Sequence, residues 1–311
     1  MEKAFKPRTL LWIAAILQIV WGLVPSASQF VIDEIPVELY IAIRWSISGF
    51  IFFAYLAISR RWKMPAPRDT AKIALLGVLG YAVGSLGFLY GLKLGGVANF
   101  AIMNALGPVI TSFTAFIVLH EKPKPIFYAA LPICVAGLIL LVVGRTEISN
   151  AKLARSTAVI LMAAATLEAL TFTFSKRLRS RVGIIEYLAI AQIAAASFMW
   201  ILQIAFFHQI GSVSHLTPRG LMSAIFVSVI ACVFCYAILY WLLKYIDGHK
   251  LALFDGVHAL SATAFGILIF HEKLNTWMIL GGILLILGLV LGTGFFDRKQ
   301  KETQLTLVES E

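Results

Sequence analysis

The sequence predicts an all-α integral membrane protein with ten transmembrane helices arranged as two inverted five-helix repeats. Its 311 residues are 60% hydrophobic and only 14% charged, with a mean hydropathy of +0.88, which leaves too little polar surface for a soluble globule. The apolar runs are nearly free of charge and lack the alternation of strands, so each predicts a membrane-spanning helix of about 20 residues. In a membrane protein, the net charge of +10 is evidence about which loops lie on which side of the bilayer, and no nucleic-acid partner is expected.

A short internal sequence repeat predicts that the chain consists of two related halves. The tripeptide His-Glu-Lys at 120–122 returns 151 residues later at 271–273, and the same shift superposes Gly137 on Gly288. Each half holds about five apolar segments, and an odd number of crossings inverts the second copy, as in many transporters. We expect a first repeat over 1–147, a second over 148–297 and a polar cytoplasmic tail over 298–311.

The apolar runs place ten helices over residues 10–32, 37–59, 70–92, 97–119, 126–144, 153–175, 184–207, 220–243, 250–270 and 276–296. With the amino terminus in the cytoplasm, nineteen of the Lys and Arg residues lie in inner segments and six in outer ones. This bias predicts a multi-pass protein of the plasma (inner) membrane with both termini in the cytoplasm. The run 10–32 is longer than the apolar part of a signal peptide, so it is interpreted as the first span.

Polar and helix-breaking residues mark the first two helices. Pro25 removes a backbone hydrogen bond, which predicts a kink that serves packing or lets the helix swing. Arg44 lies inside the second helix and must face protein or water, because lipid exposure is costly. We expect it to pair with Asp33 or Glu34 at the outer edge, with substrate contact as the alternative.

The helix over 70–92 carries glycines at steps of three and four along one face, which predicts close packing against a neighbouring helix. These glycines are Gly77, Gly80, Gly84, Gly87 and Gly91. The aromatic residues Tyr81, Phe88 and Tyr90 lie off this stripe and are candidates to line a cavity.

Further polar groups lie deep in later helices. Asn104, followed by a break at Pro108, superposes on Asp255 under the shift of 151, so both should point toward a shared axis. Asp255 and His258 share one helix face, and the sequence leaves open an internal pair, proton coupling or contact with a substrate ammonium. Glu168 lies mid-span and is interpreted as a functional group.

Enzyme and metal chemistry find no support in the sequence. The three cysteines, Cys134, Cys232 and Cys235, lie in apolar runs and are interpreted as helix packing. The two His-Glu pairs lack the second histidine of HExxH, and neither GxSxG nor GxxxxGK[ST] occurs, so we expect no enzyme, no ATP hydrolysis, no metal and no cofactor. Glu121 and Glu272 are expected to stabilise the helix starts that follow them.

Several motifs resemble those of the drug/metabolite transporter superfamily, more narrowly its EamA-domain exporters and their aromatic amino-acid exporter branch. They are Trp21-Gly22, Arg44 after Pro36, Pro108, and the loop glutamates Glu121 and Glu272. The resemblance implies a central cavity lined mainly by the first, third, fourth, sixth, eighth and ninth helices. Asp255 and His258 depart from the usual pattern of the ninth helix.

The sequence therefore predicts a secondary transporter that exports small metabolites by alternating access. Amino acids with aromatic or other apolar side chains are the favoured substrates, and a multidrug exporter of cationic amphiphiles is the alternative. Expected partners are this small molecule and the lipid bilayer, with the oligomeric state left open. Candidate substrate-binding residues are Gln18, Trp21, Tyr81, Phe88, Tyr90, Asn104, Glu168, Asp255 and His258.

Overall fold

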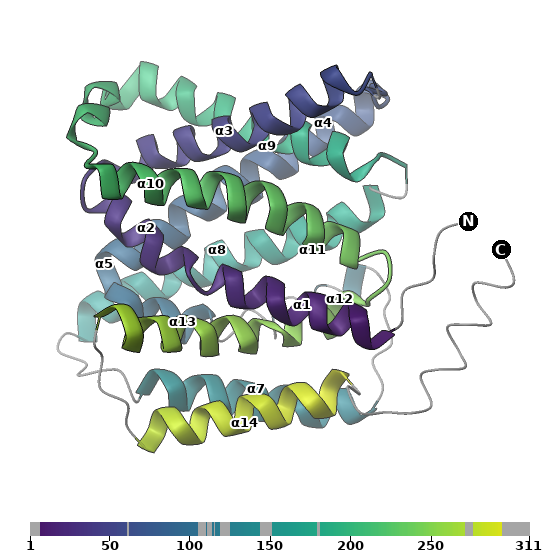
Figure 1. The fold of residues 1–311 in the computed structure, drawn as a ribbon, viewed down its shortest axis with the longest axis vertical. Coiled ribbons are helices and arrows are strands. Elements are labelled where there is room, and N and C mark those ends of the chain that lie inside the picture. Colours follow the sequence, from purple (N-terminus) through teal and green to yellow (C-terminus); the bar gives the residue numbers. More distant parts are fainter. Residues whose placement is uncertain are drawn as a thin grey trace, which may run out of the picture.

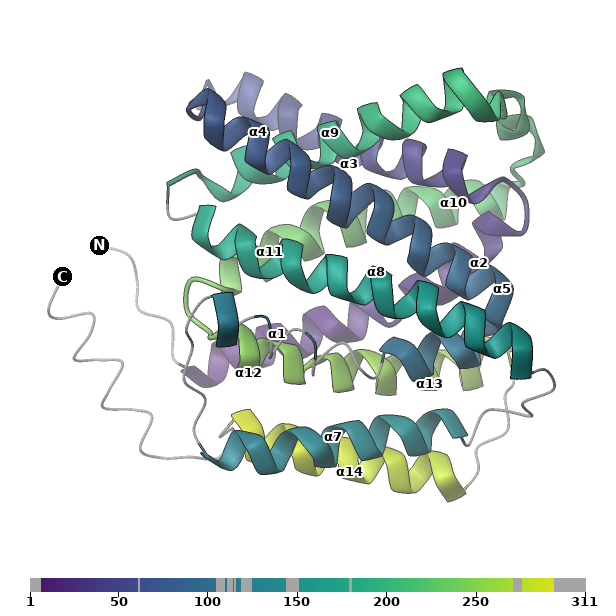
Figure 2. The same ribbon diagram turned by 180° about the vertical axis from the view of Figure 1, so that it is seen from behind.

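The structure is a computed structural model that describes residues 7–60, 62–104, 110, 114, 116–118, 125–143, 151–178, 181–270 and 276–293. In this part of the chain every regular element is a helix, and the helices lie side by side in one bundle (Figures 1 and 2). In chain order they are α1 (Pro7–Trp21), α2 (Val24–Ile32), α3 (Val37–Ile58), α4 (Pro67–Leu76), η1 (Gly77–Gly84), α5 (Ser85–Asn104), α7 (Pro125–Val143), α8 (Ala151–Leu178), α9 (Ile184–Leu202), η2 (Gln203–Phe207), η3 (Ile210–His215), α10 (Pro218–Phe226), η4 (Val227–Cys235), α11 (Tyr236–Leu242), α12 (Gly248–Leu253), α13 (Asp255–Phe270) and α14 (Thr276–Thr293).

Six helical segments among the described residues are long and apolar enough to cross a membrane. They are Arg8–Ile32, Val37–Ile58, Pro67–Leu94, Val159–Lys176, Ile184–Phe207 and Pro218–Leu242, and shorter apolar helices occur at Pro125–Gly137 and Thr276–Gly292. Of the ten predicted helices, the fourth, at 97–119, is only partly described, since residues 105–109, 111–113, 115 and 119 lie outside the described residues. The gap at 93–96 between the third and fourth predicted helices is helical in the structure, because α5 continues to Asn104 and no proline in this stretch ends it.

The first predicted span is broken in two. Gly22 and Leu23 separate α1 from α2, and Pro25 lies in the first turn of α2, where its missing N–H costs no helical hydrogen bond. The break therefore falls beside Pro25, as the sequence predicts. A glycine is required at the break, because a Cβ added to Gly22 would overlap the Oγ of Ser261 on α13.

The two halves of the broken span are held by different partners. On α1, the main-chain oxygen of Gln18 accepts a hydrogen bond from Ser261 Oγ of α13 at 3.2 Å. Beyond the end of α2, the carboxylate of Glu34 accepts from Thr217 N at 2.8 Å and from Thr217 Oγ1 at 2.7 Å. Thr217 is the N-cap of α10, and its Oγ1 accepts from Gly220 N. Thus α1 is tied to α13, whereas α2 is tied to α10.

We expect Glu34→Ala to lower the free energy of unfolding of the purified protein modestly, by about 1 kcal/mol, and so to lower its melting temperature. The reason is that α10 loses an anionic partner at its N-terminus. Asp33→Ala is the matched control. The Asp33 carboxylate accepts only a local hydrogen bond, from Gln29 at 2.7 Å, so its removal should change the melting temperature less. Equal shifts for the two variants, measured by thermal unfolding in detergent, would show that the link between α2 and α10 adds no stability.

The helices α7 and α14 pack together along one edge of the bundle in both views (Figures 1 and 2). A Cβ added at Gly137 would lie 2.7 Å from Leu285 N, and one added at Gly288 would lie 2.8 Å from Cys134 N. Residue numbers therefore rise along α7 as they fall along α14, so the helices run antiparallel. The two contacts are also reciprocal, because 151 residues separate Cys134 from Leu285 and Gly137 from Gly288.

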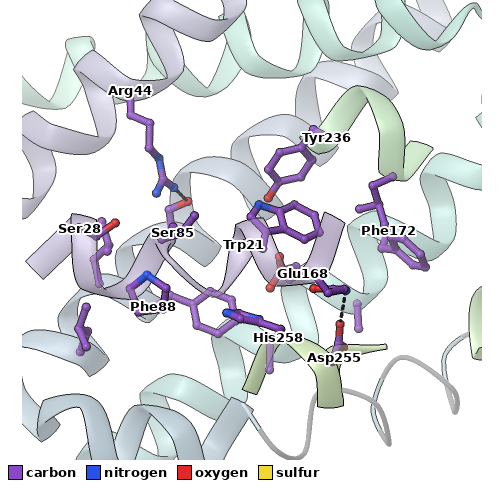
Figure 3. Close-up of a pocket in the computed structure, with 18 of the residues that line it drawn as sticks. Trp21, Ser28, Arg44, Ser85, Phe88, Glu168, Phe172, Tyr236, Asp255 and His258 are labelled. Atoms are coloured by element: carbon purple, nitrogen blue, oxygen red, sulfur yellow. Dashed lines mark hydrogen bonds between the residues drawn. The ribbon is translucent and has the colours of Figure 1, made fainter. Parts of the chain in front are cut away.

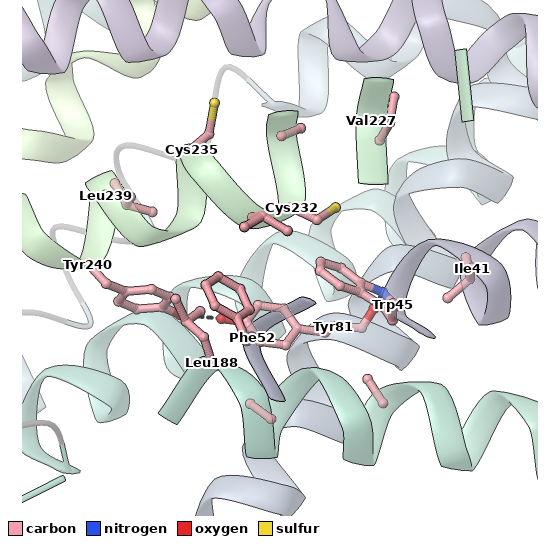
Figure 4. Packing of buried hydrophobic residues seen from close by; sticks show 14 of the residues in the cluster. Ile41, Trp45, Phe52, Tyr81, Leu188, Val227, Cys232, Cys235, Leu239 and Tyr240 are labelled. Carbon is pink, nitrogen blue, oxygen red and sulfur yellow. Dashed lines mark hydrogen bonds between the residues drawn. The ribbon is translucent and has the colours of Figure 1, made fainter. Parts of the chain in front are cut away.

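A layer of buried aromatic side chains supports the centre of the bundle (Figure 4). Trp45 Nε1 on α3 donates to the main-chain oxygen of Tyr81 on η1 at 2.7 Å, and the hydroxyls of Tyr81 and Tyr240 are hydrogen-bonded at 2.6 Å. These bonds connect α3, η1 and α11. Cys232 and Cys235 are free thiols buried in the same core, as their interpretation as packing residues requires.

Candidate functional site

A cavity of about 230 Å³ lies between α1, α2, α3, α5, α8, α11, α12 and α13. Its walls combine apolar and aromatic side chains with a few charged and polar groups (Figure 3). This composition is typical of small-molecule sites, in which apolar walls provide most of the contact and a few polar groups fix orientation.

The aromatic walls come from four helices. Trp21, Phe88, Phe172 and Tyr236 line the cavity from α1, α5, α8 and α11. Trp21 and Tyr236 meet edge to face with ring centroids 5.3 Å apart. Tyr236 also contacts the ring of Tyr81 behind it at 5.3 Å, so the wall rests on the buried aromatic layer. Such packing holds both rings in defined positions.

One end of the cavity is cationic. Arg44 on α3 is 8% exposed, and its Nη2 donates to Ser85 Oγ at 2.6 Å. Its guanidinium lies 4.6 Å from the ring centroid of Trp45, within the range of a cation–π contact. The predicted pairing of Arg44 with Asp33 or Glu34 is wrong, since these carboxylates accept hydrogen bonds from Gln29 and Thr217 instead.

The other end is acidic. Asp255 on α13 accepts a hydrogen bond from Gln18 Nε2 on α1 at 3.0 Å, so its partner is the neighbouring helix and not His258 (Figure 3). Glu168 on α8 also lines the cavity, and its side chain is exposed there. His258 completes this end. Two carboxylates and an imidazole therefore face the same space within the membrane-spanning bundle.

The structure brings six of the nine predicted site residues together around the cavity: Gln18, Trp21, Phe88, Glu168, Asp255 and His258. Tyr81 lies behind the wall with its hydroxyl bonded to Tyr240. Tyr90 points to α3, where its hydroxyl donates to Glu38. The side chain of Asn104 lies outside the described residues, as do Pro108 and the loop glutamates Glu121 and Glu272.

Several lining residues were not among the predicted site residues. Ser28, Ser85, Phe172 and Tyr236 all line the cavity, but serines and aromatic residues are common in membrane helices, so no sequence signal separated them from packing residues. Arg44 did carry a signal, because a cation within an apolar span needs a partner. Although Glu168, Asp255 and His258 share the cavity, in the described part of the chain no three His, Cys, Asp or Glu side chains lie close enough together to hold one metal ion.

Comparison with known proteins identifies the family of this chain. The model of the EamA-like transporter family matches twice, over residues 8–143 and 155–293. The chain is 22% identical over 283 residues to "Uncharacterized transporter YoaV" of Bacillus subtilis (strain 168), covering 91% of this chain and 96% of that protein. One crystal structure superposes with a TM-score of 0.77 at 15% identity, over 92% of this chain and 98% of the other, and so shares the fold. The chain belongs to the EamA-like transporter family and is a membrane transporter.

Proposed function

We propose that this transporter exports small amine-bearing metabolites, amino acids with aromatic or other apolar side chains, by alternating access. The observation that supports this substrate class is the acidic end of an aromatic-walled cavity. Glu168 and Asp255 can accept hydrogen bonds from a substrate ammonium, and Trp21, Phe88 and Tyr236 offer flat apolar surfaces to its side chain.

The alternative substrate is a cationic amphiphile, which needs carboxylates and aromatic walls but no anion site. The same cavity holds the positive charge of Arg44. A purely cationic substrate would be repelled by this charge, whereas a zwitterion presents an anionic group as well. The presence of both signs of charge in one cavity therefore favours the amino acid.

The proposed architecture is two inverted five-helix repeats, over residues 1–147 and 148–297, in the plasma membrane with both termini in the cytoplasm. Its support is the double match of the family model and the reciprocal, antiparallel contact between α7 and α14. In inverted repeats the substrate site lies between the halves, and one bundle rocks against the other. The first span can bend at the break between α1 and α2 during such a motion.

Uptake into proteoliposomes that contain the purified full-length protein tests the substrate class. We expect unlabelled phenylalanine to compete with labelled phenylalanine far better than phenylalaninamide, which keeps the ammonium but lacks the carboxylate. Equal competition would favour the cationic-amphiphile alternative. Recovery of chemically altered substrate would instead indicate an enzyme, and liposomes without protein provide the background.

A further inference from the structure

The guanidinium of Arg44 is buried and incompletely partnered. The residue is 8% exposed, its Nη2 donates to Ser85 Oγ, and its Nε has no hydrogen-bond partner. Within the described residues, no carboxylate forms an ion pair with it. A buried cation with no carboxylate in direct contact is costly in a membrane protein. An apolar side chain at this position would pack at a lower free-energy cost, so packing alone does not explain Arg44.

Two hydroxyl groups, of Ser85 and Ser28, line the cavity at the same end as this cation (Figure 3). Ser85 Oγ accepts from Arg44, which leaves its own O–H available to donate. Ser28 on α2 also lines the cavity, and its Oγ is 3.2 Å from the hydroxyl of Tyr40. The Nε–H of Arg44 and the two serine hydroxyls are therefore supplied by three helices, and all are suited to an anionic oxygen.

We propose that Arg44, Ser85 and Ser28 form the subsite for the substrate carboxylate. This inference rests on the proposed function, and it names the group that reads the anionic end of the amino acid. Figure 3 shows Arg44, Ser28 and Ser85 at one end of the cavity and Glu168 and Asp255 at the other, with Trp21 between them. An α-amino acid placed across the cavity thus has its carboxylate at α3, its ammonium at α8 and α13, and its side chain against the aromatic walls.

Three small molecules test the two charges of the substrate one at a time and together. Phenylalanine carries both, 3-phenylpropionate carries only the carboxylate, and phenethylamine carries only the ammonium. Their binding is measured by calorimetry on the purified full-length protein in detergent. We expect Arg44→Gln to weaken binding of phenylalanine and 3-phenylpropionate about ten- to hundredfold and to leave phenethylamine unchanged or bound more tightly.

Two further variants serve as controls. Arg219→Gln makes the same chemical change outside the cavity, at a guanidinium that lies 3.5 Å from the ring centroid of Phe30, and should leave all three affinities unchanged. Arg44→Lys keeps the charge but loses the planar fork of donors. It should show a smaller loss, again confined to the two carboxylate probes, and it provides the measurement if Arg44→Gln fails to fold.

The outcomes separate this inference from the proposed function. If the wild type transports phenylalanine and Arg44→Gln binds it equally well, the carboxylate subsite is wrong while the substrate class stands. If 3-phenylpropionate binds in an Arg44-dependent manner but phenylalanine is not transported, the subsite stands and the proposed substrate class fails. An equal loss for all three probes in both Arg44 variants assigns Arg44 to structure, and no binding of either carboxylate probe to the wild type overturns the proposal.

Discussion

Gly77→Ala is expected to destabilise the protein severely. Gly77 faces the main chain of Ala191 on α9, and an added Cβ would lie 2.7 Å from the carbonyl carbon and would overlap the carbonyl oxygen. A backbone atom of a packed helix cannot move aside as a flexible side chain can, so α9 must shift as a whole. Overpacking of this kind costs about 1–3 kcal/mol and occasionally more. We expect a large drop in the melting temperature or loss of the monodisperse protein on size-exclusion chromatography.

Gly84→Ala is the matched control on the same helix. An added Cβ at Gly84 would have its nearest neighbours at 3.6 Å and 3.9 Å, the main-chain oxygens of Leu79 and Ala164, which is ordinary van der Waals contact. Alanine also favours the helix over glycine. The Gly84 variant should therefore keep or slightly raise the melting temperature, and similar losses at both positions would refute the close approach of η1 and α9.

The glycine stripe illustrates how much of the fold is predictable from the sequence. Glycines at helical spacing predict close packing, and Gly80, Gly87 and Gly91 do meet side chains of α8, namely Thr171, Ala164 and Leu161. The π-helical geometry of η1, over Gly77–Gly84, was not predictable, because no residue type in this segment distinguishes a π-helix from an α-helix. Within η1, Gly77 packs tightly against Ala191 of α9, whereas an added Cβ at Gly84 would make only ordinary van der Waals contacts.

Site residues were predictable only where burying a charged side chain within an apolar span costs free energy. Glu168 and Asp255 stood out because a carboxylate in an apolar span needs a function or a partner. The sequence did not indicate that Tyr236 lines the cavity, since aromatic residues occur in all ten predicted helices. The partner of Arg44 was misassigned because Glu34, although near in sequence, is engaged by Thr217, which lies 183 residues further along the chain.

Glu168→Gln is expected to weaken the transport of amino acids strongly while the protein stays folded. The glutamate side chain is exposed in the cavity, so glutamine of the same shape should fit without strain. What is lost is the charge that attracts the substrate ammonium. A hydrogen bond to a charged group contributes about 1.5–3 kcal/mol, which corresponds to a loss of affinity of about ten- to hundredfold.

The matched control is Glu186→Gln, the same change in the first turn of α9 and outside the cavity. It should leave the uptake of phenylalanine near the wild-type rate. Thermal unfolding of both variants in detergent checks that neither has lost its fold. If Glu168→Gln transports normally, the ammonium must be read by Asp255, and Asp255→Asn becomes the decisive variant.

A second readout distinguishes substrate binding from proton movement. Glu168 shares the cavity with Arg44 of α3, Tyr236 of α11, and Asp255 and His258 of α13. Of these groups, the Asp255 carboxylate and the His258 imidazole can take up a proton released in the cavity, whereas the guanidinium of Arg44 stays protonated. Exchange of labelled for unlabelled phenylalanine requires binding but no net driving force, whereas uptake under an imposed pH gradient also requires coupling. Because the proposed role of Glu168 is binding, Glu168→Gln should lose both activities together. Retained exchange with loss of only the gradient-driven uptake would assign Glu168 to the proton pathway instead.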